Sequence, residues 1–378
     1  MRKVPLCIPG TGPEEINAVT EILASGWLAH GPKNHEFEEQ FTSYLGVKHA
    51  ITMNSCTSAL HLAVEALELT GEVIVPSFTW MASANAILLA GAQPVLVDID
   101  VDTRNISIAS IEEAITPKTQ AIMPVHYAGL PANMPQIIEI ARKHNLRVIE
   151  DSAECLGGTY HGVQAGSYDI GCFSFFPTKN ITTGEGGMFT TNDDALGKKV
   201  RALAAHGVDS STYQRELSKQ PWLRMSSSFG YNFRMSNLLA AIGVEQMKKL
   251  SRFNQARTKV AERYFSNLGK CDVIRFQQTP SDYVNAWQMF TVLVPLEFRD
   301  EMVLALRDKG VGASVHFHPA VHQQAVYKDV KRVASLANTE QVASRLITLP
   351  IYPTMTMEDV DYVSESIASF LKTKGITV

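Results

Sequence analysis

Short apolar runs alternate with helical patterns through the first half of the chain. Seven runs rich in valine, isoleucine and other apolar residues are spread over residues 49–191, namely 49–53, 72–77, 94–100, 121–127, 147–151, 171–176 and 187–191. Helical periodicity appears between several of them, at 58–69, 81–91 and 134–145. Continuous apolar strands separated by helices are typical of a largely parallel sheet that is buried on both faces.

Helical patterns also flank this region. Residues 14–26 and 34–46 predict two helices before the first strand, and a long pattern over 236–268 predicts a helix after the last one. So long a helix is a natural connector to a second domain. The rest of the chain predicts strands and helices in alternation, with strands at 290–295, 313–317 and 348–353, a helix at 301–310 and a last helix from Met357.

The length of the chain, 378 residues, exceeds what one hydrophobic core usually supports. We therefore expect two domains. Residues 1–250 should form a three-layer α/β/α domain around a mostly parallel seven-stranded sheet. Residues 251–378 should form a smaller α+β domain.

Charge and cysteine content argue against several classes of protein. The net charge is −4 and the basic residues are scattered, whereas a nucleic-acid-binding surface needs a clustered basic patch. The five cysteines are odd in number and no pair has C-x-x-C spacing, so we expect neither a disulfide framework nor zinc. No stretch approaches the ~20 apolar residues of a membrane span, and the apolar run at the N-terminus is too short for a signal peptide. We expect a cytoplasmic protein with no membrane or nucleic-acid partner.

Candidate site residues follow from the position of the strands. In a sheet of this kind, ligands bind beyond the carboxyl ends of the strands. Asp151 and Glu154 lie at and just after the end of the run at 147–151, and Lys179 lies just after the run at 171–176. An aspartate there often only caps the next helix, but opposite a heteroaromatic nitrogen it would stabilise the protonated form of that ring.

Lys179 stands in the stretch FSFFPTKNITTGEGG, residues 173–187. It could be a solvated surface residue, a phosphate contact, or a nucleophile that forms a Schiff base. Covalent chemistry requires an amine that is neutral near pH 7, and hence partly desolvated or close to other cations. The FSFFP residues would supply an apolar side, and the glycines of GEGG would let backbone approach closely. Taken alone, this stretch leaves all three roles open.

Three further segments are candidates, each with a simpler explanation. A helix begins near Thr57 and its N-terminus would attract an anion, although helix capping by Ser55 or Thr57 explains the pattern as well. Trp80 follows a strand, where an aromatic residue is more often packed in the core than stacked on a cofactor ring. Asn232 and Arg234 precede the long helix, and capping or surface positions explain either one.

Together, these features indicate one cofactor. An anion site, an aromatic face, a strand-end aspartate and a strand-end lysine are what pyridoxal phosphate requires of a protein, which positions and tunes the cofactor's own chemistry. The N-terminus of the helix that begins near Thr57 is the expected phosphate-binding site.

The sequence resembles the sugar aminotransferases of the DegT/DnrJ/EryC1/StrS family, a branch of the fold-type I pyridoxal phosphate enzymes. The resemblance extends over about residues 12–365, and the matching segments occur in family order. Its segments include GWLAHGPKNHEFEEQF, TSALHLA, VPSFTWMASANAI, VIEDSAECLGG, FSFFPTKNITTGEGG, GYNFRMSNLLAAIG, VHFHPAVHQQ and LPIYP. It implies the aspartate aminotransferase fold for the large domain.

The resemblance also implies a role for each matched residue. Lys179 would form the Schiff base with the cofactor, and Asp151 would pair with its pyridinium nitrogen. Thr57, Ser58 and Ser174 would hold the phosphate.

Trp80 would lie against the cofactor ring, and Asn232 would reach the phosphate from the other subunit, which implies a homodimer with shared active sites. His316 and His318 belong to a stretch that looks like the family's substrate loop, and we expect them and Arg234 to contact the substrate. The H-x-H spacing could also suggest a metal site, but no carboxylates nearby in the sequence support one, so no metal is expected.

The sequence departs from the family pattern at two positions. Many members carry His or Tyr where Phe176 stands, so a polar contact near the lysine is absent here. Glu154 occupies a position that is commonly Gln or His, hydrogen-bonded to the phenolic oxygen of the cofactor. A carboxylate beside a phenolate is unfavourable unless it holds a proton or faces the substrate.

The resemblance implies an aminotransferase that works in two stages. L-glutamate would donate the amino group and a keto-sugar nucleotide would receive it, with Lys179 as nucleophile, general acid and general base. The segments HYAG at 126–129 and NAWQMF at 285–290, together with Trp80, most resemble members that act on UDP-linked 4-keto sugars. This favours C4 of a 4-keto-6-deoxy sugar nucleotide, with C3 transfer as the alternative, and products that feed polysaccharide biosynthesis.

A sugar dehydratase and a regulatory protein are the two competing functions for a chain of this family. In the sugar dehydratase branch the lysine is replaced, typically by His, so Lys179 argues against that branch. A regulatory protein could keep the fold without turnover, but it would have no physical need for both Asp151 and Lys179.

Overall fold

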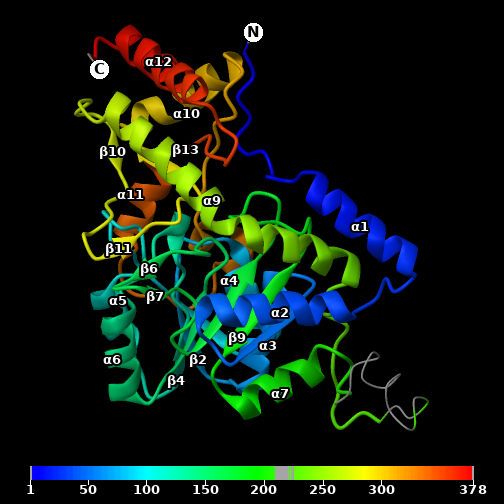
Figure 1. Cartoon of the computed structure of the whole chain (residues 1–378). Coiled ribbons are helices and arrows are strands. Elements are labelled where there is room, and N and C mark those ends of the chain that lie inside the picture. Colours follow the sequence, from blue (N-terminus) through cyan, green and yellow to red (C-terminus); the bar gives the residue numbers. More distant parts are fainter. Residues whose placement is uncertain (1, 209–219, 221, 223–224, 377–378) are drawn as a thin grey trace.

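The computed structural model describes residues 2–208, 220, 222 and 225–376 (Figure 1). One large sheet contains seven of the described strands, in the order β1 (His49–Met53), β9 (Gly187–Thr191), β8 (Ile170–Ser174), β5 (Arg147–Asp151), β4 (Thr119–Ile122), β2 (Glu72–Pro76) and β3 (Gln93–Val97). β9 runs antiparallel to both of its neighbours, and the other adjacent pairs are parallel. The prediction of a mostly parallel seven-stranded sheet is therefore confirmed.

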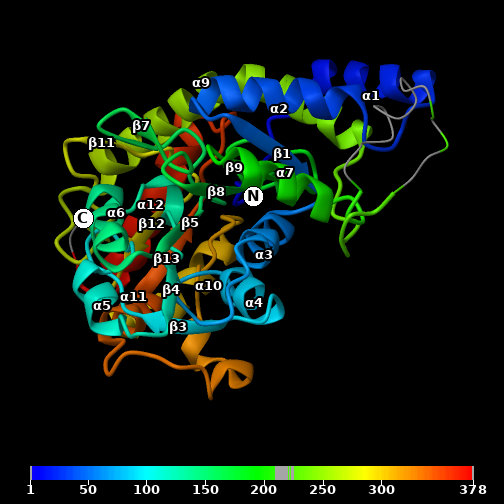
Figure 2. The same ribbon diagram turned by 90° about the horizontal axis from the view of Figure 1, so that it is seen from below.

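Helices cover both faces of this sheet (Figure 2). One face packs against α3 (Cys56–Ala66), α4 (Met81–Leu89) and α7 (Asp194–Leu203), and the other against α2 (Pro32–Leu45), α5 (Ile108–Ala114), α6 (Met134–His144) and α9 (Asn237–Leu268). Successive residues of β2 alternate between the two faces, since Val73 and Val75 pack with α3 whereas Ile74 packs with α6. The predicted three-layer architecture follows from this two-sided burial.

A second, smaller sheet lies beyond α9. Its antiparallel strands are β10 (Arg275–Phe276), β12 (Phe290–Leu293) and β13 (Leu346–Leu349), with α10 (Leu296–Asp308) and α12 (Met357–Thr373) packed against it. The N-terminal segment joins this part of the molecule, because Val4 forms a β-bridge with Val311. Both ends of the chain therefore lie near α12 (Figure 1). α9 runs through residue 250 without a break, and the domain boundary expected there stays a prediction.

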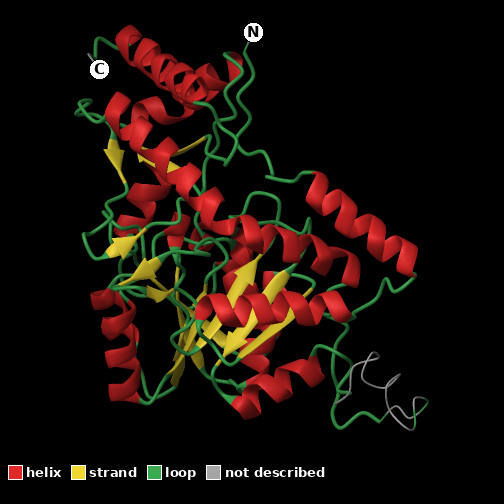
Figure 3. Ribbon diagram, viewed as in Figure 1, coloured by secondary structure: helices red, strands yellow, loops and turns green. Residues whose placement is uncertain are grey.

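The remaining elements are short or peripheral (Figure 3). They are α1 (Pro13–Ser25), α11 (Ala337–Arg345), the 3₁₀ turns η1 (Tyr127–Gly129), η2 (Val321–Gln323) and η3 (Ala325–Tyr327), and a small sheet of β11 (Tyr283–Val284), β6 (Thr159–Tyr160) and β7 (Val163–Gln164). The strand predicted at 313–317 is wrong, since only Ser314 forms a bridge there, with Thr348. Phe317 is instead buried in a hydrophobic cluster, and His316 lies in a cavity wall.

Among the described residues, no helix is both long and apolar enough to cross a membrane. The same residues contain no group of three or more His, Cys, Asp or Glu side chains that could hold a metal ion. The five cysteines, all of them described, are free thiols.

Candidate active site

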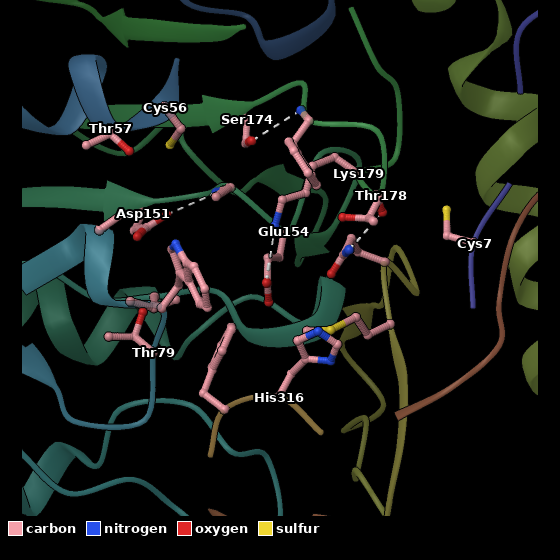
Figure 4. A pocket seen from close by; sticks show the side chains of 18 of the residues that line it. Cys7, Cys56, Thr57, Thr79, Asp151, Glu154, Ser174, Thr178, Lys179 and His316 are labelled. Atoms are coloured by element: carbon pink, nitrogen blue, oxygen red, sulfur yellow. Dashed lines mark hydrogen bonds and ion pairs between the residues drawn. The ribbon is translucent and has the colours of Figure 1, made fainter. Parts of the chain in front are cut away.

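A cavity of about 430 Å³ opens beyond the carboxyl ends of β5 and β8 (Figure 4). Its far wall is formed by the segment with His316 and Phe317 and by residues of β13. Seven of the residues predicted from the sequence line it, namely Thr57, Trp80, Asp151, Glu154, Ser174, Lys179 and His316. The cavity therefore lies where an open α/β sheet is expected to bind its ligand.

Lys179 follows β8 in a tight turn and points into the cavity (Figure 4). Its Nζ lies 3.2 Å from Glu154 Oε1, and the two side chains are 16% and 8% exposed. The other carboxylate oxygen of Glu154 accepts a hydrogen bond from the backbone N–H of Ala128 at 3.1 Å. Glu154 thus holds the free amine of Lys179 in place by a largely buried ion pair.

The backbone on either side of Lys179 is held by side chains from other elements. The Nε2 of Gln288 donates to the carbonyl oxygen of Thr178 at 2.9 Å. Arg257 of α9 donates to the carbonyl oxygens of Lys179 and Asn180, at 3.1 and 3.2 Å. Three consecutive carbonyls therefore have side-chain donors, which restricts the position of the lysine.

Asp151 ends β5, and its carboxylate is buried in the cavity wall (Figure 4). The hydroxyl of Ser83 donates to Oδ2 at 2.7 Å, and the backbone N–H of Ala153 donates to Oδ1 at 3.2 Å. Burial raises the pKa of Asp151, and these two hydrogen bonds oppose the rise. A cation placed against this carboxylate would be strongly stabilised, because the site is screened from water.

The N-terminus of α3 forms another wall. Ser55 caps the helix by accepting from the N–H of Ser58, and Thr57 lies in the first turn, where backbone N–H groups have no partner within the helix. Gly187 lies directly against this turn, because a Cβ atom there would come within 2.5 Å of Cys56 N. The expectation that a glycine of GEGG permits close backbone approach is confirmed at this position.

Trp80 and His316 face the cavity from two other sides. The Trp80 side chain is 56% exposed and its ring lies 6.1 Å from that of Phe317, so a flat surface is left open to a ligand. The imidazole Nδ1 of His316 lies 2.9 Å from the hydroxyl of Thr348. Burial lowers the pKa of His316, which favours a neutral imidazole at neutral pH.

The structure does not bring all predicted residues to this cavity. Ser58, Asn232, Arg234 and His318 are not part of its lining. The hydroxyl of Ser58 donates to Asn54 Oδ1 at 2.6 Å, and Arg234 donates to the side-chain oxygen of Asn232 from Nε at 3.1 Å and from a terminal nitrogen at 2.9 Å. The roles expected for these four residues stay predictions.

Two lining residues, Gln288 and Thr348, and Ser83 behind the lining residue Asp151 were not singled out individually from the sequence. Ser83 contacts Asp151, Thr348 contacts His316, and Gln288 contacts the backbone next to Lys179. Ser83 could have been found from helical spacing, since it lies three residues after Trp80 in the first turn of α4. Nothing local marks Thr348 or Gln288, because each belongs to the second sheet or its approach and reaches the cavity only through tertiary packing.

The residues present fit pyridoxal phosphate. A helix N-terminus next to Thr57 and Ser174 suits a phosphate, and Trp80 offers an exposed aromatic face. Asp151 offers a buried carboxylate to a ring nitrogen, and Lys179 offers an amine in the same cavity.

This fold defines the class of protein, because solved structures of aminotransferases superpose on nearly the whole chain. The model of the DegT/DnrJ/EryC1/StrS aminotransferase family matches residues 9–368. The chain belongs to that family, whose members share the fold-type I architecture.

Three relatives show the extent of the similarity. The chain is 39% identical over 390 residues to the spore coat polysaccharide biosynthesis protein SpsC of Bacillus subtilis, covering 98% of this chain and 97% of that protein. Helicobacter pylori PseC, an aminotransferase involved in the biosynthesis of pseudoaminic acid, superposes with a TM-score of 0.92 at 28% identity over 98% of this chain and 100% of that one. NtdA from Bacillus subtilis, solved with bound cofactor PMP, gives a TM-score of 0.84 at 33% identity over 95% of this chain and 81% of its own.

Proposed function

We propose that the protein transfers an amino group from L-glutamate to C4 of a 4-keto-6-deoxy sugar nucleotide, with pyridoxal phosphate as the cofactor. One observation carries the assignment. The amine of Lys179, the carboxylate of Asp151 and the N-terminus of α3 line a single cavity at the strand ends. The family is one of aminotransferases, and the names of SpsC and PseC associate those relatives with polysaccharide and pseudoaminic acid biosynthesis.

When bound, pyridoxal phosphate supplies the carbonyl carbon that takes the amino group and a ring that withdraws electrons. Asp151 would keep a proton on the ring nitrogen, and Thr57 and Ser174 would bind the phosphate with the free N–H groups of α3. Trp80 would cover one face of the ring. Nζ of Lys179 would be the amine that holds the cofactor, and as a free amine it would act as the general acid and base that moves the proton at the donor's Cα.

In this proposal the imidazole of His316 contacts the sugar, which is supported by its position in the cavity lining and its contact with Thr348 (Figure 4). The segments at 126–129 and 285–290 support C4 as the position of transfer, and C3 is the alternative. Glutamate as donor and the cytoplasm as location belong to the same proposal.

Charge supports a homodimer with shared sites. The described lining contains three carboxylates, those of Asp151, Glu154 and Glu185, and a single ammonium group, that of Lys179. A cofactor phosphate and a nucleotide diphosphate need further donors and cations, which a second copy of the chain would supply. Asn232 and Arg234 lie outside the cavity of their own chain, and we assign them to the site of the partner.

The experiment incubates the purified protein and pyridoxal phosphate with L-glutamate and a panel of 3-keto and 4-keto sugar nucleotides. Mass spectrometry of the products shows which ketone becomes an amine. If only a 3-keto sugar is aminated, the position of amino transfer is C3 and not C4. A protein that forms 2-oxoglutarate but aminates only simple α-keto acids would contradict the sugar assignment, and a protein that never turns yellow would support a non-catalytic role.

Mixed dimers test the shared site. The Lys179→Ala and Asn232→Ala variants are each expected to be nearly inactive, and mixing them under exchange conditions should restore about a quarter of the activity, since half of the dimers are mixed and each has one intact site. No recovery upon demonstrated subunit exchange would show that both residues act within one chain.

A further inference from the structure

Gln288 is a buried cavity residue that has an unused hydrogen-bond acceptor. It lies just before β12, its side chain is 5% exposed, and it is part of the cavity lining. Its Oε1 has no donor among the described residues. Of the buried side-chain polar atoms without a partner in the described part of the chain, it is the one that belongs to a residue of the cavity lining.

The orientation of this amide is determined by its neighbour. The carbonyl oxygen of Thr178, 2.9 Å away, can only accept a hydrogen bond, so the amide nitrogen of Gln288 must face it. Oε1 is therefore the atom left over. Buried acceptors in native proteins nearly always have a donor from protein, water or ligand. Because Gln288 belongs to the cavity lining, a ligand is the natural source of that donor.

The chemistry of the two substrates indicates which one supplies it. This step rests on the proposed function. Both carboxylates of L-glutamate are acceptors when ionised, and its amino group is the one that reacts. A keto-sugar nucleotide has hydroxyl groups, which donate. We propose that Gln288 is a specificity-determining residue whose Oε1 accepts a hydrogen bond from a hydroxyl group of the keto-sugar.

This role connects substrate binding to the catalytic lysine. The same side chain that receives the sugar hydroxyl holds the carbonyl of Thr178, one residue before Lys179. A sugar with its hydroxyl in the correct place would stabilise Gln288 and thereby the turn that carries Lys179. A ligand without that hydroxyl would leave the acceptor unsatisfied, which is the physical basis for rejecting it.

The chain offers a matched control in Gln277. Its side chain is 4% exposed, and its Nε2 donates to the carbonyl oxygens of Thr103 and Tyr127 at 2.8 and 3.2 Å. Its Oε1 also has no donor among the described residues. Gln277 does not belong to the cavity lining, so it matches Gln288 in burial and bonding but not in access to the ligand.

The test compares the wild-type holoenzyme, Gln288→Met and Gln277→Met on the keto-sugar nucleotide that the wild type aminates, and on analogues that each lack one sugar hydroxyl. For a UDP-linked 4-keto-6-deoxyhexose these are the 2-deoxy and 3-deoxy forms. The glutamate and sugar half-reactions are followed separately by cofactor absorbance. In the wild type, loss of one particular hydroxyl should lower kcat/KM about 10-fold. In Gln288→Met, removal of the same hydroxyl should lower kcat/KM less than about 2-fold. The effects of the substitution and of the missing hydroxyl would then not be additive.

Several outcomes decide the matter. Gln277→Met should show the wild-type response to every analogue. Gln288→Met also loses the N–H to Thr178, so both of its half-reactions should slow, and the sugar half-reaction should slow by the larger factor. Gln288→Glu keeps an acceptor but loses the N–H to Thr178, and it should still prefer the hydroxylated sugar. Equal losses in all variants, or an equal slowing of the glutamate half-reaction in Gln288→Met, would overturn the role of Oε1. A wild type that aminates no keto-sugar nucleotide would instead overturn the proposed function, and this inference with it.

Discussion

Arg257 donates a hydrogen bond to the main-chain carbonyl oxygen of Lys179, 78 positions away in the sequence, at 3.1 Å. A second one, at 3.2 Å, reaches the carbonyl of Asn180. The Arg257 side chain is 2% exposed, and burial lowers its pKa to about 10. No salt bridge joins it to a carboxylate among the described residues. A buried cation bonded only to neutral carbonyls is costly, so its constraint on the lysine turn is the benefit that we infer.

Replacing Arg257 by Met should reduce both stability and activity. Two buried carbonyls lose their donors, which should cost about 2 to 4 kcal/mol in the free energy of unfolding. Without this restraint Lys179 can move from its catalytic position. We expect kcat to fall about 10²-fold, because a small displacement of a catalytic group lowers the rate by about this factor. Urea unfolding and steady-state kcat measure the two effects.

Arg104 provides the control for this variant. It is 1% exposed, burial also lowers its pKa to about 10, and it too donates to main-chain carbonyls, those of Thr291 and Arg275. Arg104→Met should lose a similar amount of stability while kcat falls less than about 3-fold. Equal losses of kcat in the two variants would show that stability alone explains the effect of Arg257.

Lys179→Ala should abolish turnover while the protein still binds the cofactor, because the phosphate and ring contacts come from other residues. In the wild type, borohydride treatment followed by peptide mass spectrometry should find the cofactor attached to Lys179. Lys48, whose side chain is 61% exposed, is the control, and its Ala variant should keep wild-type activity and labelling. Full activity in Lys179→Ala would refute the assignment.

Asp151→Asn should separate stability from function. Burial raises the pKa of Asp151 above its ordinary 3.8, so in the cofactor-free protein its contribution to stability is present below that pH and is lost as the pH rises through the raised pKa. The Asn variant avoids this loss. It should therefore be more stable than the wild type above that range, and its activity should fall at least about 10²-fold because the ring nitrogen loses its anion.

Urea unfolding of the cofactor-free proteins across pH tests the stability part. Asp169, which is bonded to Arg147 at 2.8 and 3.0 Å, serves for comparison, and Asp169→Asn should destabilise the protein instead. If Asp151→Asn proved less stable than the wild type at neutral pH, its hydrogen bonds to Ser83 and Ala153 would outweigh the cost of burying its charge.

Glu154→Gln should bind pyridoxal phosphate more tightly, by about 10-fold if roughly 1.4 kcal/mol is gained. In the free protein the carboxylate is paired with the Lys179 ammonium group at 3.2 Å, and cofactor binding consumes that partner. An amide loses less when the lysine is consumed. Titration by absorbance gives the dissociation constant, with Glu185→Gln as the control, since Glu185 also lines the cavity and has no ion pair among the described residues. Weaker binding in Glu154→Gln would mean that the carboxylate itself holds the cofactor.

Much of the fold could be predicted because it depends on local pattern. Each of the seven apolar runs overlaps a strand of the large sheet, since a strand buried on both faces is apolar along most of its length. The run at 121–127 is the poorest match, because β4 ends at Ile122. The strand predicted at 313–317 failed because an alternating pattern records only which side chains are buried. Phe317 is buried there by the cavity wall and not by a sheet partner.

The sequence by itself also determined most of the candidate site. Asp151 and Lys179 end or follow neighbouring parallel strands, β5 and β8, and the carboxyl ends of such strands meet at one edge. A strand order and a handed crossover are enough to bring these two side chains together.

The residues that hold and complete this site could not be found without the packing of the folded chain. Arg257 of α9 and Gln288 near the second sheet reach the lysine turn from 78 and 110 positions away in the sequence. Thr348 of β13 reaches His316 in the cavity wall from 32 positions away. Their roles depend on how α9 and the second sheet pack against the large domain. No local sequence pattern marks these side chains. Their roles follow from the burial and the hydrogen-bond partners that they acquire when the chain packs.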